Sequence, residues 1–574
     1  MTARRLDGFV AIVLAMHSAG AVSQTADHAD GRVMAPLVAD TIYDNGRIFT
    51  PTGWAKSFAV GKGLILAVGD AQAVLSNRGP HTRVVDLHGA VVFPGLNDAH
   101  VHVRWAGLEL IKCNIGADAT QRQMIEIVKA CVAGRPRGEW IEGGGWTDRA
   151  FAQEPVSRAA LDAVSAGHPV VLGKQGDFGT TPIVWANSMA LKMAGVSLDS
   201  EKPAGGPVAR DRHGVPTGVL SGEAAMRIMR LIPLPDRKRN VRAVEAGLDE
   251  MLSNGVTSFT DAMAEEEDLQ IYAELFDAGR LRQRVKACLR WSDTDARAAA
   301  EALIRNRRYF ARERISTDCV KLYPDGAPMD RTSRMLAPYE GDPDNRGVWN
   351  LQPERLKELA IAFDARGLTL KIHATGDGSV RAALDAIEAA RKANGWTAHL
   401  HEVAHNSFVS AQDLPRARQI GAVFEYSPYI WYPTPMGDAA TRPQVGDWRM
   451  EREHPAREAL DAGALLVGGS DWPYSAAESP WLGIETLVTR KAPGGSGKAL
   501  APKEAITLRE AIDMFTVNAA KGLGKRAERG AIEAGLLADF VILDRNPLQI
   551  PITEVHETRA TQVYIQGEQV YPRH

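Results

Sequence analysis

The sequence has few cysteines, four in 574 residues, and no two of them form a Cys-x-x-Cys pair. That spacing is typical of zinc knuckles and thiol redox motifs, so its absence argues against both. The chain also lacks an excess of charge of one sign, since its formal net charge is −3. No basic arm or stripe indicates a nucleic-acid partner, and we expect a small-molecule substrate instead.

Long hydrophobic runs are missing too, because no stretch reaches the ~18 uninterrupted apolar residues of a membrane span. One short apolar run, FVAIVLAM (residues 9–16), follows Arg4 and Arg5 and precedes the small residues SAGAVS (residues 18–23). This order predicts a cleavable signal peptide over residues 1–23, and the alternative is a buried N-terminal helix. We therefore expect a periplasmic or secreted protein with no membrane anchor.

Export would place the four cysteines in an oxidising compartment. Cys113 and Cys131 bracket a helical segment, TQRQMIEIVKA, and the sequence leaves open whether they form a disulfide. Cys288 and Cys319 lie on apolar strand-like runs, where buried free thiols are the better expectation.

The middle of the chain alternates short apolar runs with amphipathic helical patterns such as SVRAALDAIEAARKA (residues 379–393). Alternation of this kind indicates parallel β–α units. Eight strand-like runs occur, within residues 91–103, 255–262, 284–290, 318–326, 368–376, 399–406, 421–428 and 464–472. Eight such units predict an α/β fold of the (β/α)8, TIM-like barrel type.

Both ends of the chain consist of short strands and turns, with a hairpin signal at Asn45-Gly46. They predict one small composite β-sandwich over residues 36–92 and 526–574. Roughly 150 residues separate the first and second strand-like runs of the middle, which is too many for a loop. We therefore predict a barrel over residues 93–138 and 226–525, with an insert domain over residues 139–225 after the first strand.

Polar residues lie at or near the ends of the predicted barrel strands. Active sites of such barrels form at the carboxyl ends of the strands, where residues distant in sequence converge. Imidazoles and carboxylates are suitable ligands for zinc and similar metals, and a His-x-His pair places both rings on one face of an extended segment. The predicted metal ligands are His100, His102, Lys321, His373, His405 and Asp471.

Each member of this set has a simpler interpretation on its own. A lone His-x-His pair is often incidental, Lys321 is compatible with a lysine whose charged end reaches solvent, and Asp471 with a helix cap. The position of all six at the same end of the strands is what favours a metal site. The sixth run holds His399, His401 and His405 on one face. We choose His405, because it lies at the carboxyl end, and keep His401 as the alternative.

At these residues the sequence resembles the amidohydrolase superfamily, and within it the YtcJ-like group of amidohydrolase family 3. The similarity covers nearly all of the chain after the predicted signal peptide. The resemblance implies a TIM-like barrel, a β-sandwich built from both chain ends and an insert after the first strand. Its motifs are NGRIFT, FPGLNDAHVHV, WANSMAL, GVPTGVL, GVTSFTDA, VKLYPDGAPMDRTS, HATGDGSVRAALDAIE, VAHN, GGSDWP and GAIEAGLLADFVILDRNP.

The resemblance also implies a centre of two divalent metal ions. By the family pattern, His100 and His102 bind the more buried ion together with Asp471, and His373 and His405 bind the second. Lys321 stands where many relatives carry a carboxylated lysine that bridges the two ions. Zinc is the expected metal, manganese and iron would also fit, and a one-metal site stays open.

The activity that the resemblance implies is hydrolysis of an amide-type C–N bond in an N-acyl, N-formyl or cyclic amide. Divalent metals lower the pKa of a bound water, so hydroxide forms near neutral pH. Asp471 is expected to act as general acid and base, taking a proton and passing it to the leaving amine. The alternatives are a deaminase, a lactone or ester hydrolase, and a catalytically inactive binding protein. The sequence leaves open whether the chain forms a homodimer.

Two stretches depart from the family pattern. GDFGTTPIVWANS lacks the histidine that relatives usually carry before this motif, and Ala404 stands where many relatives have a carboxylate. The substrate group recognised there is therefore expected to differ. Motif position alone suggests Trp146, Arg331 and Trp472 as substrate contacts. Their alternatives are the core of the insert, a surface salt bridge and packing at the barrel rim, respectively.

Overall fold

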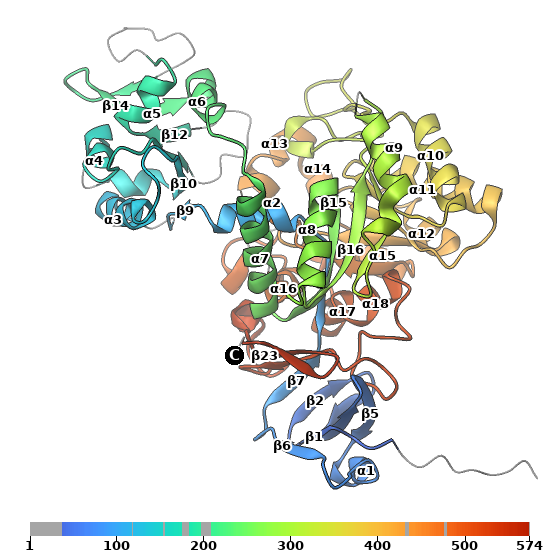
Figure 1. Cartoon of the computed structure of the whole chain (residues 1–574). Helices are drawn as coiled ribbons and strands as arrows, with labels where there is room; N and C mark the ends of the chain where they lie inside the picture. Colours follow the sequence, from blue (N-terminus) through green and yellow to red (C-terminus); the bar gives the residue numbers. More distant parts are fainter. Residues whose placement is uncertain are drawn as a thin grey trace, which may run out of the picture. The chain divides into compact units, whose positions relative to one another are not determined.

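The computed structural model describes residues 37–116, 119–152, 155–174, 183–196, 208–294, 296–430, 435–475 and 479–572. The chain divides into two units, Met1–Leu37 and Val38–His574, and every element named below belongs to the second (Figure 1). The predicted signal peptide lies outside the described residues. Within those residues, no helix combines the length and the apolar character that a membrane crossing requires.

Eight parallel strands form the largest sheet, in the order β21-β20-β19-β18-β17-β16-β15-β8. Hydrogen bonds at the carboxyl ends of β21 and β8 join the two outer strands. The amide of Asp471, just after β21, donates to the carbonyl of His100 in β8 over 2.7 Å. The sheet is thereby nearly closed, which confirms the predicted barrel. The strands are β8 (Leu96–Val101), β15 (Val256–Ala264), β16 (Arg284–Arg290), β17 (Ile315–Leu322), β18 (Thr369–Ala374), β19 (His401–His405), β20 (Ala422–Tyr426) and β21 (Leu465–Gly468).

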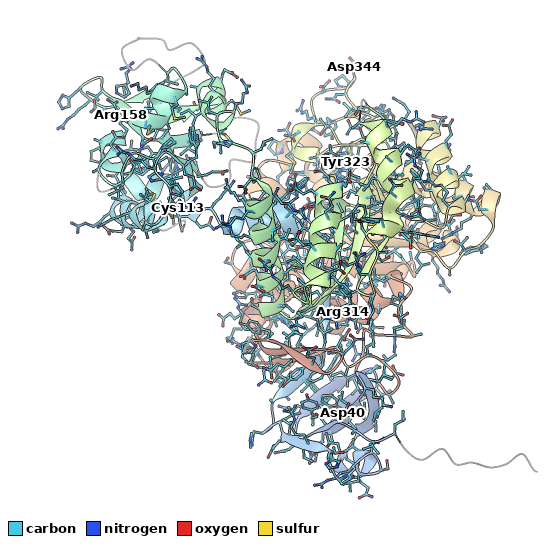
Figure 2. All side chains as sticks on the ribbon, in the orientation of Figure 1. Asp40, Cys113, Arg158, Arg314, Tyr323 and Asp344 are labelled. Atoms are coloured by element: carbon cyan, nitrogen blue, oxygen red, sulfur yellow. A yellow bond between two sulfur atoms is a disulfide. The ribbon has the colours of Figure 1, made fainter. Side chains whose placement is uncertain are left out.

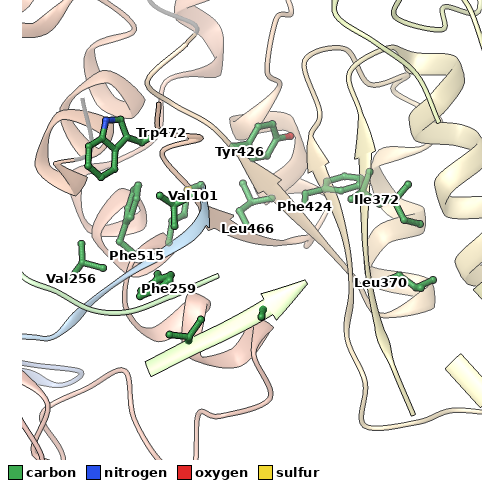
Figure 3. Close-up of a cluster of buried hydrophobic side chains, with 14 of the residues drawn as sticks. Val101, Val256, Phe259, Leu370, Ile372, Phe424, Tyr426, Leu466, Trp472 and Phe515 are labelled. Atoms are coloured by element: carbon green, nitrogen blue, oxygen red, sulfur yellow. The ribbon is translucent and has the colours of Figure 1, made fainter. Parts of the chain in front are cut away.

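Polar and apolar residues alternate along the barrel strands and therefore face opposite sides of the sheet. In β18, Leu370 and Ile372 belong to a large apolar cluster that also contains residues of α11 (Asp377–Asn394). Figure 3 shows these two side chains with other strand residues of the cluster. Lys371 and His373 alternate with them and so face the barrel interior. The alternation keeps apolar packing against the helices and leaves a polar interior.

Helices pack on the outer face of this sheet, as α7 and α8 do on β15 (Figure 1). α7 begins after Asp236, whose side chain accepts a hydrogen bond from the Arg239 amide. The helices of the barrel region, besides α11, are α2 (Val103–Leu110), α7 (Arg237–Ser253), α8 (Glu266–Asp277), α9 (Arg297–Asn306), α10 (Pro353–Ala365), α12 (Leu414–Ile420), α13 (Arg442–Val445), α14 (Asp447–Met450), α15 (Ala456–Asp461), α16 (Pro480–Thr489), α17 (Leu508–Met514) and α18 (Val517–Gly522).

Strands from both ends of the chain form two further sheets. One has the order β5-β4-β1-β6, and the other, β24-β23-β22-β7-β2-β3, combines N-terminal and C-terminal strands. Tyr43 of the first sheet packs edge-on against Phe540 of the second, with ring centroids 5.1 Å apart. The elements are β1 (Thr41–Asp44), β2 (Arg47–Thr50), β3 (Gly53–Ala55), β4 (Ser57–Gly61), β5 (Leu64–Gly69), α1 (Ala71–Leu75), β6 (Arg83–Asp86), β7 (Val91–Pro94), β22 (Phe540–Leu543), β23 (Ala560–Ile565) and β24 (Glu568–Tyr571).

The long segment after β8 contains its own sheet, in the order β13-β14-β12-β11-β10-β9. This sheet includes β9 (Cys113–Asn114), and α3 (Gln121–Val132) packs into the same apolar core. Both elements precede residue 139, where the insert is predicted to begin. The other elements are β10 (Ile141–Trp146), α4 (Arg158–Asp162), β11 (Val170–Lys174), β12 (Ile183–Ala186), α5 (Ser188–Met193), β13 (Val208–Arg210), β14 (Pro216–Ser221) and α6 (Gly222–Met229).

All four cysteines form disulfides. Cys113–Cys131 joins β9 to α3, and Cys288–Cys319 joins β16 to β17. The prediction of free thiols at the second pair is therefore wrong. The strand register places these two cysteines side by side, with Cα atoms 4.3 Å apart. An apolar run indicates burial but carries no register, so the sequence alone gave no sign of this pairing.

Candidate metal centre

The six predicted ligands all line one cavity of about 1040 Å³ at the carboxyl ends of the barrel strands. Figure 2 shows the direction in which β17 runs. Arg314, just before the strand, and Tyr323, just after it, lie at opposite ends of the barrel. Tyr323 lines the same cavity. The ligands lie in β8 (His100), just after β8 (His102), in β17 (Lys321), β18 (His373) and β19 (His405), and just after β21 (Asp471).

Asp471 lies close to three of the predicted histidine ligands. Its Oδ1 atom lies 3.2 Å from Nε2 of His102 and 3.5 Å from Nε2 of His100. Its Oδ2 atom lies 3.9 Å from Nδ1 of His405. Nζ of Lys321 lies 3.5 Å from Nε2 of His100. One ligand atom each from His100, His102 and Asp471 fall within 4.8 Å of one another, a spacing that can hold a metal ion.

His373 completes the group from the next strand. Its ring lies edge-on to that of His405, with centroids 4.6 Å apart, and stacks on Tyr323 at 3.8 Å. Nε2 of His373 lies 3.0 Å from the carbonyl oxygen of Gly326, which can only accept a hydrogen bond. Nε2 therefore carries the proton, and the lone pair of Nδ1 stays available for a ligand.

Burial keeps three of the site histidines neutral. It lowers the pKa of His373 to about 3, and it lowers the pKa of His100 and of His405 well below the ordinary range. Burial and the charge of Lys371 also lower the pKa of Lys321, to about 7. Neutral imidazoles have the lone pair that metal binding requires.

The backbone at two of these residues has an unusual conformation. His405 has φ 75° and Asp471 has φ 56°. Both values lie in the left-handed region of the backbone, which residues other than glycine rarely adopt. Such strained residues cluster at functional sites, where the surrounding structure holds them in place. Nδ1 of His102 is buried and has no hydrogen-bond partner among the described residues. These features, together with the neutral imidazoles and the carboxylate, fit a divalent metal.

The alternative ligand in β19 is excluded by its contacts. Nδ1 of His401 accepts a hydrogen bond from the Leu370 amide over 3.1 Å, and its Nε2 lies 3.0 Å from Asp364. Both ring nitrogens are therefore engaged in structural bonds, and His401 is not among the described residues that line the cavity. His405, four residues later, has turned into the cavity with the left-handed backbone.

The three predicted substrate contacts do not line the cavity in the described structure. Trp146 lies in the core of the insert, where its Nε1 donates to the Leu172 carbonyl over 2.8 Å. Trp472 is buried in the apolar cluster of the barrel. Nε of Arg331 donates to Gln444 over 2.7 Å. Each therefore has the structural role given above as its alternative, except that Arg331 bonds chiefly to uncharged acceptors. Motif position did not indicate the direction of these side chains.

Four charged residues beneath the histidines escaped the sequence interpretation. Lys286, Lys371, Glu402 and Glu425 lie in β16, β18, β19 and β20 and are nearly or fully buried. A signal existed for three of them, because Lys286, Lys371 and Glu425 each stand between two apolar residues of a strand-like run. Without the register, however, the sequence did not show which of them meet.

The fold and the site define a (β/α)8-barrel protein with a candidate metal centre at the carboxyl ends of its strands. The model of the amidohydrolase family matches residues 83–571, and the chain belongs to that family. The prediction of an amidohydrolase is thereby confirmed.

Relatives of known name cover nearly the whole chain. It is 28% identical over 557 residues to the protein LONG AFTER FAR-RED 3 of Arabidopsis thaliana, with 94% of this chain and 92% of that protein covered. It is 27% identical over 541 residues to the N-substituted formamide deformylase of Arthrobacter pascens, with 90% and 95% covered. The crystal structure of a metal-dependent hydrolase from Pyrococcus furiosus shares the fold, with a TM-score of 0.67, 23% identity, and 89% of this chain and 100% of that chain covered.

Proposed function

We propose that the protein is a metal-dependent hydrolase that cleaves an amide-type C–N bond, such as that of an N-acyl, N-formyl or cyclic amide. The observation that carries this proposal is the convergence of four imidazoles, the Lys321 amine and the Asp471 carboxylate in one cavity. The relative from Arthrobacter pascens, named an N-substituted formamide deformylase, supports a C–N bond as the target. The cavity, about 1040 Å³, suits a small molecule.

The metal-binding roles are part of the proposal. His100, His102 and Asp471 would hold one divalent ion, and His373 and His405 a second. Zinc suits this set of imidazoles and carboxylate, and manganese or iron would also fit. When bound, such ions lower the pKa of a water molecule and polarise the substrate carbonyl.

Asp471 transfers the proton in this scheme. Its carboxylate takes the proton of the attacking water while the C–O bond forms at the carbonyl carbon. It then delivers that proton to the nitrogen as the C–N bond breaks, so the products are an amine and a carboxylic acid. The two oxygens of Asp471 face three histidines, so the carboxylate is held at the centre of the group.

Lys321 is proposed to bridge the two ions as a carbamate, formed when its neutral amine adds CO2. The side chain is buried, and its Nζ lies 3.5 Å from a ring nitrogen of His100. An unmodified ammonium group there would place a positive charge beside the ions, which is unfavourable. Carbon-13 NMR after incubation with labelled bicarbonate should show a carbamate signal that is lost in Lys321→Met. A one-metal site with no such signal would contradict the bridge.

A substrate panel tests the proposed reaction. Protein stripped of metal and reloaded with zinc, manganese or iron is incubated with N-formyl, N-acyl and cyclic amides, aminated heterocycles, esters and lactones. The proposal expects metal-dependent release of an amine together with an acid. Ammonia release would indicate a deaminase, and turnover of esters or lactones alone would indicate the other hydrolase class. A protein that binds no metal and turns over nothing would be an inactive binding protein.

Export is proposed as well. The support is that the cysteines form two disulfides, which persist in oxidising compartments outside the cytoplasm. N-terminal sequencing of the protein from the periplasm or the medium should find a chain that starts at or near residue 24. Recovery of the uncleaved chain in the cytoplasm alone would contradict this proposal.

A further inference from the structure

A row of buried charges runs through the barrel interior to His100. Lys286 contacts Glu402 over 2.8 Å, and Glu402 contacts Lys371 over 2.7 Å. Lys371 lies 3.6 Å from Glu425, and Oε2 of Glu425 lies 2.6 Å from Nδ1 of His100. The row thus connects β16, β18, β19 and β20 with β8, the first strand of the barrel.

Packing does not explain these residues. Barrel interiors are normally filled by branched apolar side chains, and buried ion pairs are often no more stable than apolar residues of similar size. The side chains of Lys371 and Glu425 have no solvent exposure. The two lysines and the two glutamates balance in charge, so the row is neutral as a whole. The row also has an effect on the candidate metal centre, through the contact of Glu425 with His100.

Glu425 selects which nitrogen of His100 faces the cavity. A carboxylate can only accept, so the short contact places the imidazole proton on Nδ1. Nε2 then has the lone pair, and it lies 3.5 Å from both Asp471 Oδ1 and Lys321 Nζ.

Lys371 holds both partners of this bond in place. Its Nζ donates to the carbonyl oxygen of Ala99, which precedes His100 in β8, over 2.9 Å. The same ammonium group lies beside Oε2 of Glu425. Ser427 Oγ donates to the other carboxylate oxygen, Oε1, over 3.2 Å. The carboxylate is therefore fixed from two sides, and the backbone that carries His100 is fixed with it.

We propose that Glu425 is a positioning residue for the metal centre, which acts by fixing the ring and the proton of His100, and that Lys371 holds it there. This inference rests on the proposed function, because it takes His100 to be a metal ligand. Partners of this kind typically change metal affinity about 10- to 100-fold when they are replaced.

Glu425→Gln tests the proposal in the full-length protein with zinc as the probe. The amide can donate as well as accept, so it no longer dictates which nitrogen of His100 carries the proton. The zinc dissociation constant, measured by competition with a chromophoric chelator, should rise about 10- to 100-fold. The thermal unfolding midpoint of the metal-free protein is measured in parallel, because a purely structural role would lower that midpoint and leave the affinity of the folded protein unchanged.

Glu485→Gln is the matched control, since this glutamate is also fully buried and lies 2.7 Å from a histidine nitrogen, Nδ1 of His556, but has no described contact with a predicted ligand. Its zinc affinity should change less than about threefold, well below the expected effect of a direct partner. Equal losses in both variants, or unchanged affinity in Glu425→Gln, would overturn the proposal.

Glu425→Asp serves if the glutamine variant does not fold. It keeps the charge and shortens the reach, so an intermediate loss of zinc affinity is expected, and wild-type affinity would overturn the proposal. If the wild-type protein itself bound no zinc, manganese or iron, the proposed function would fail instead, and the two failures are thereby distinguished.

Discussion

Asp471→Asn separates proton transfer from metal binding. Asparagine has the size of aspartate and keeps one carbonyl oxygen near His102 and His100, where Oδ1 now lies at 3.2 and 3.5 Å. It cannot, however, accept a proton from water and return it to a leaving nitrogen. The substitution should therefore remove a step of the reaction while the histidines still hold much of the metal.

The size of the effect follows from the value of a positioned general base, which contributes about 10²- to 10⁴-fold in rate. That range corresponds to about 3–5 kcal/mol of transition-state stabilisation. The loss should appear in kcat, because Asp471 is one of many residues that line the cavity and the rest of the binding surface is unchanged. KM should change much less than kcat.

The assay measures kcat and KM on the best amide of the panel, with metal content determined by mass spectrometry of the same samples. Asp461→Asn is the control, because Asp461 ends α15 and its side chain is 67% exposed. A near-normal kcat for Asp471→Asn would refute the assignment of Asp471 as the proton carrier. Complete loss of metal from Asp471→Asn would instead show a ligand role that outweighs proton transfer.

Three further outcomes can be measured without a substrate. Thiol titration of the unfolded, unreduced protein should find no free thiol, and a stoichiometry of two would contradict the second disulfide. Asp364→Asn should lower the free energy of unfolding at neutral pH by about 1–3 kcal/mol, because the carboxylate bonds to His401. That bond lowers the pKa of Asp364 in the folded protein to about 2. The stability difference between wild type and Asp364→Asn should therefore be fully present above the pKa of an unfolded aspartate and should vanish as the pH falls through the folded-state pKa. A stability difference that persists in strong acid would contradict the pairing. Gly469→Ala should lower zinc content and cost about 1–3 kcal/mol of stability, because the new Cβ would lie 2.5 Å from Cβ of His100. Gly116→Ala, where a Cβ meets open space, should do neither.

The grouping of the six predicted ligands around one cavity could be predicted, because barrel topology constrains it. Parallel strands end at one rim, so a histidine at the end of one apolar run must meet a lysine or aspartate at the end of another. The choice of His405 over His401 followed from position in the strand alone. The contacts of the two side chains in the structure agree with that choice. His401 has both nitrogens bonded to β18 and α10, whereas His405 adopts φ 75° and turns into the cavity.

What could not be predicted depends on register and side-chain direction. Cys288 and Cys319 meet only because the two strands pair at those positions, and the alternation of apolar residues in each strand does not contain that information. The same holds for Glu425, which faces His100 across the barrel interior and not along the chain. The prediction of Trp146 as a substrate contact has a related weakness. Its motif gave a position in the insert but not the direction of the side chain, which points into the core of the insert.

The ligand set and the substrate contacts therefore require different kinds of evidence. The predicted ligands lie on the strands or just after them, where parity and topology constrain the direction of a side chain. We expect the substrate contacts to lie on the loops after the strands, where neither rule applies. The described loops supply Ser292, Asp293, Asn350 and Tyr474 to the cavity wall. These four vary in charge and hydrogen-bonding capacity, so changes among them should alter which amide is preferred, whereas changes among the strand residues should alter whether any amide is cleaved at all.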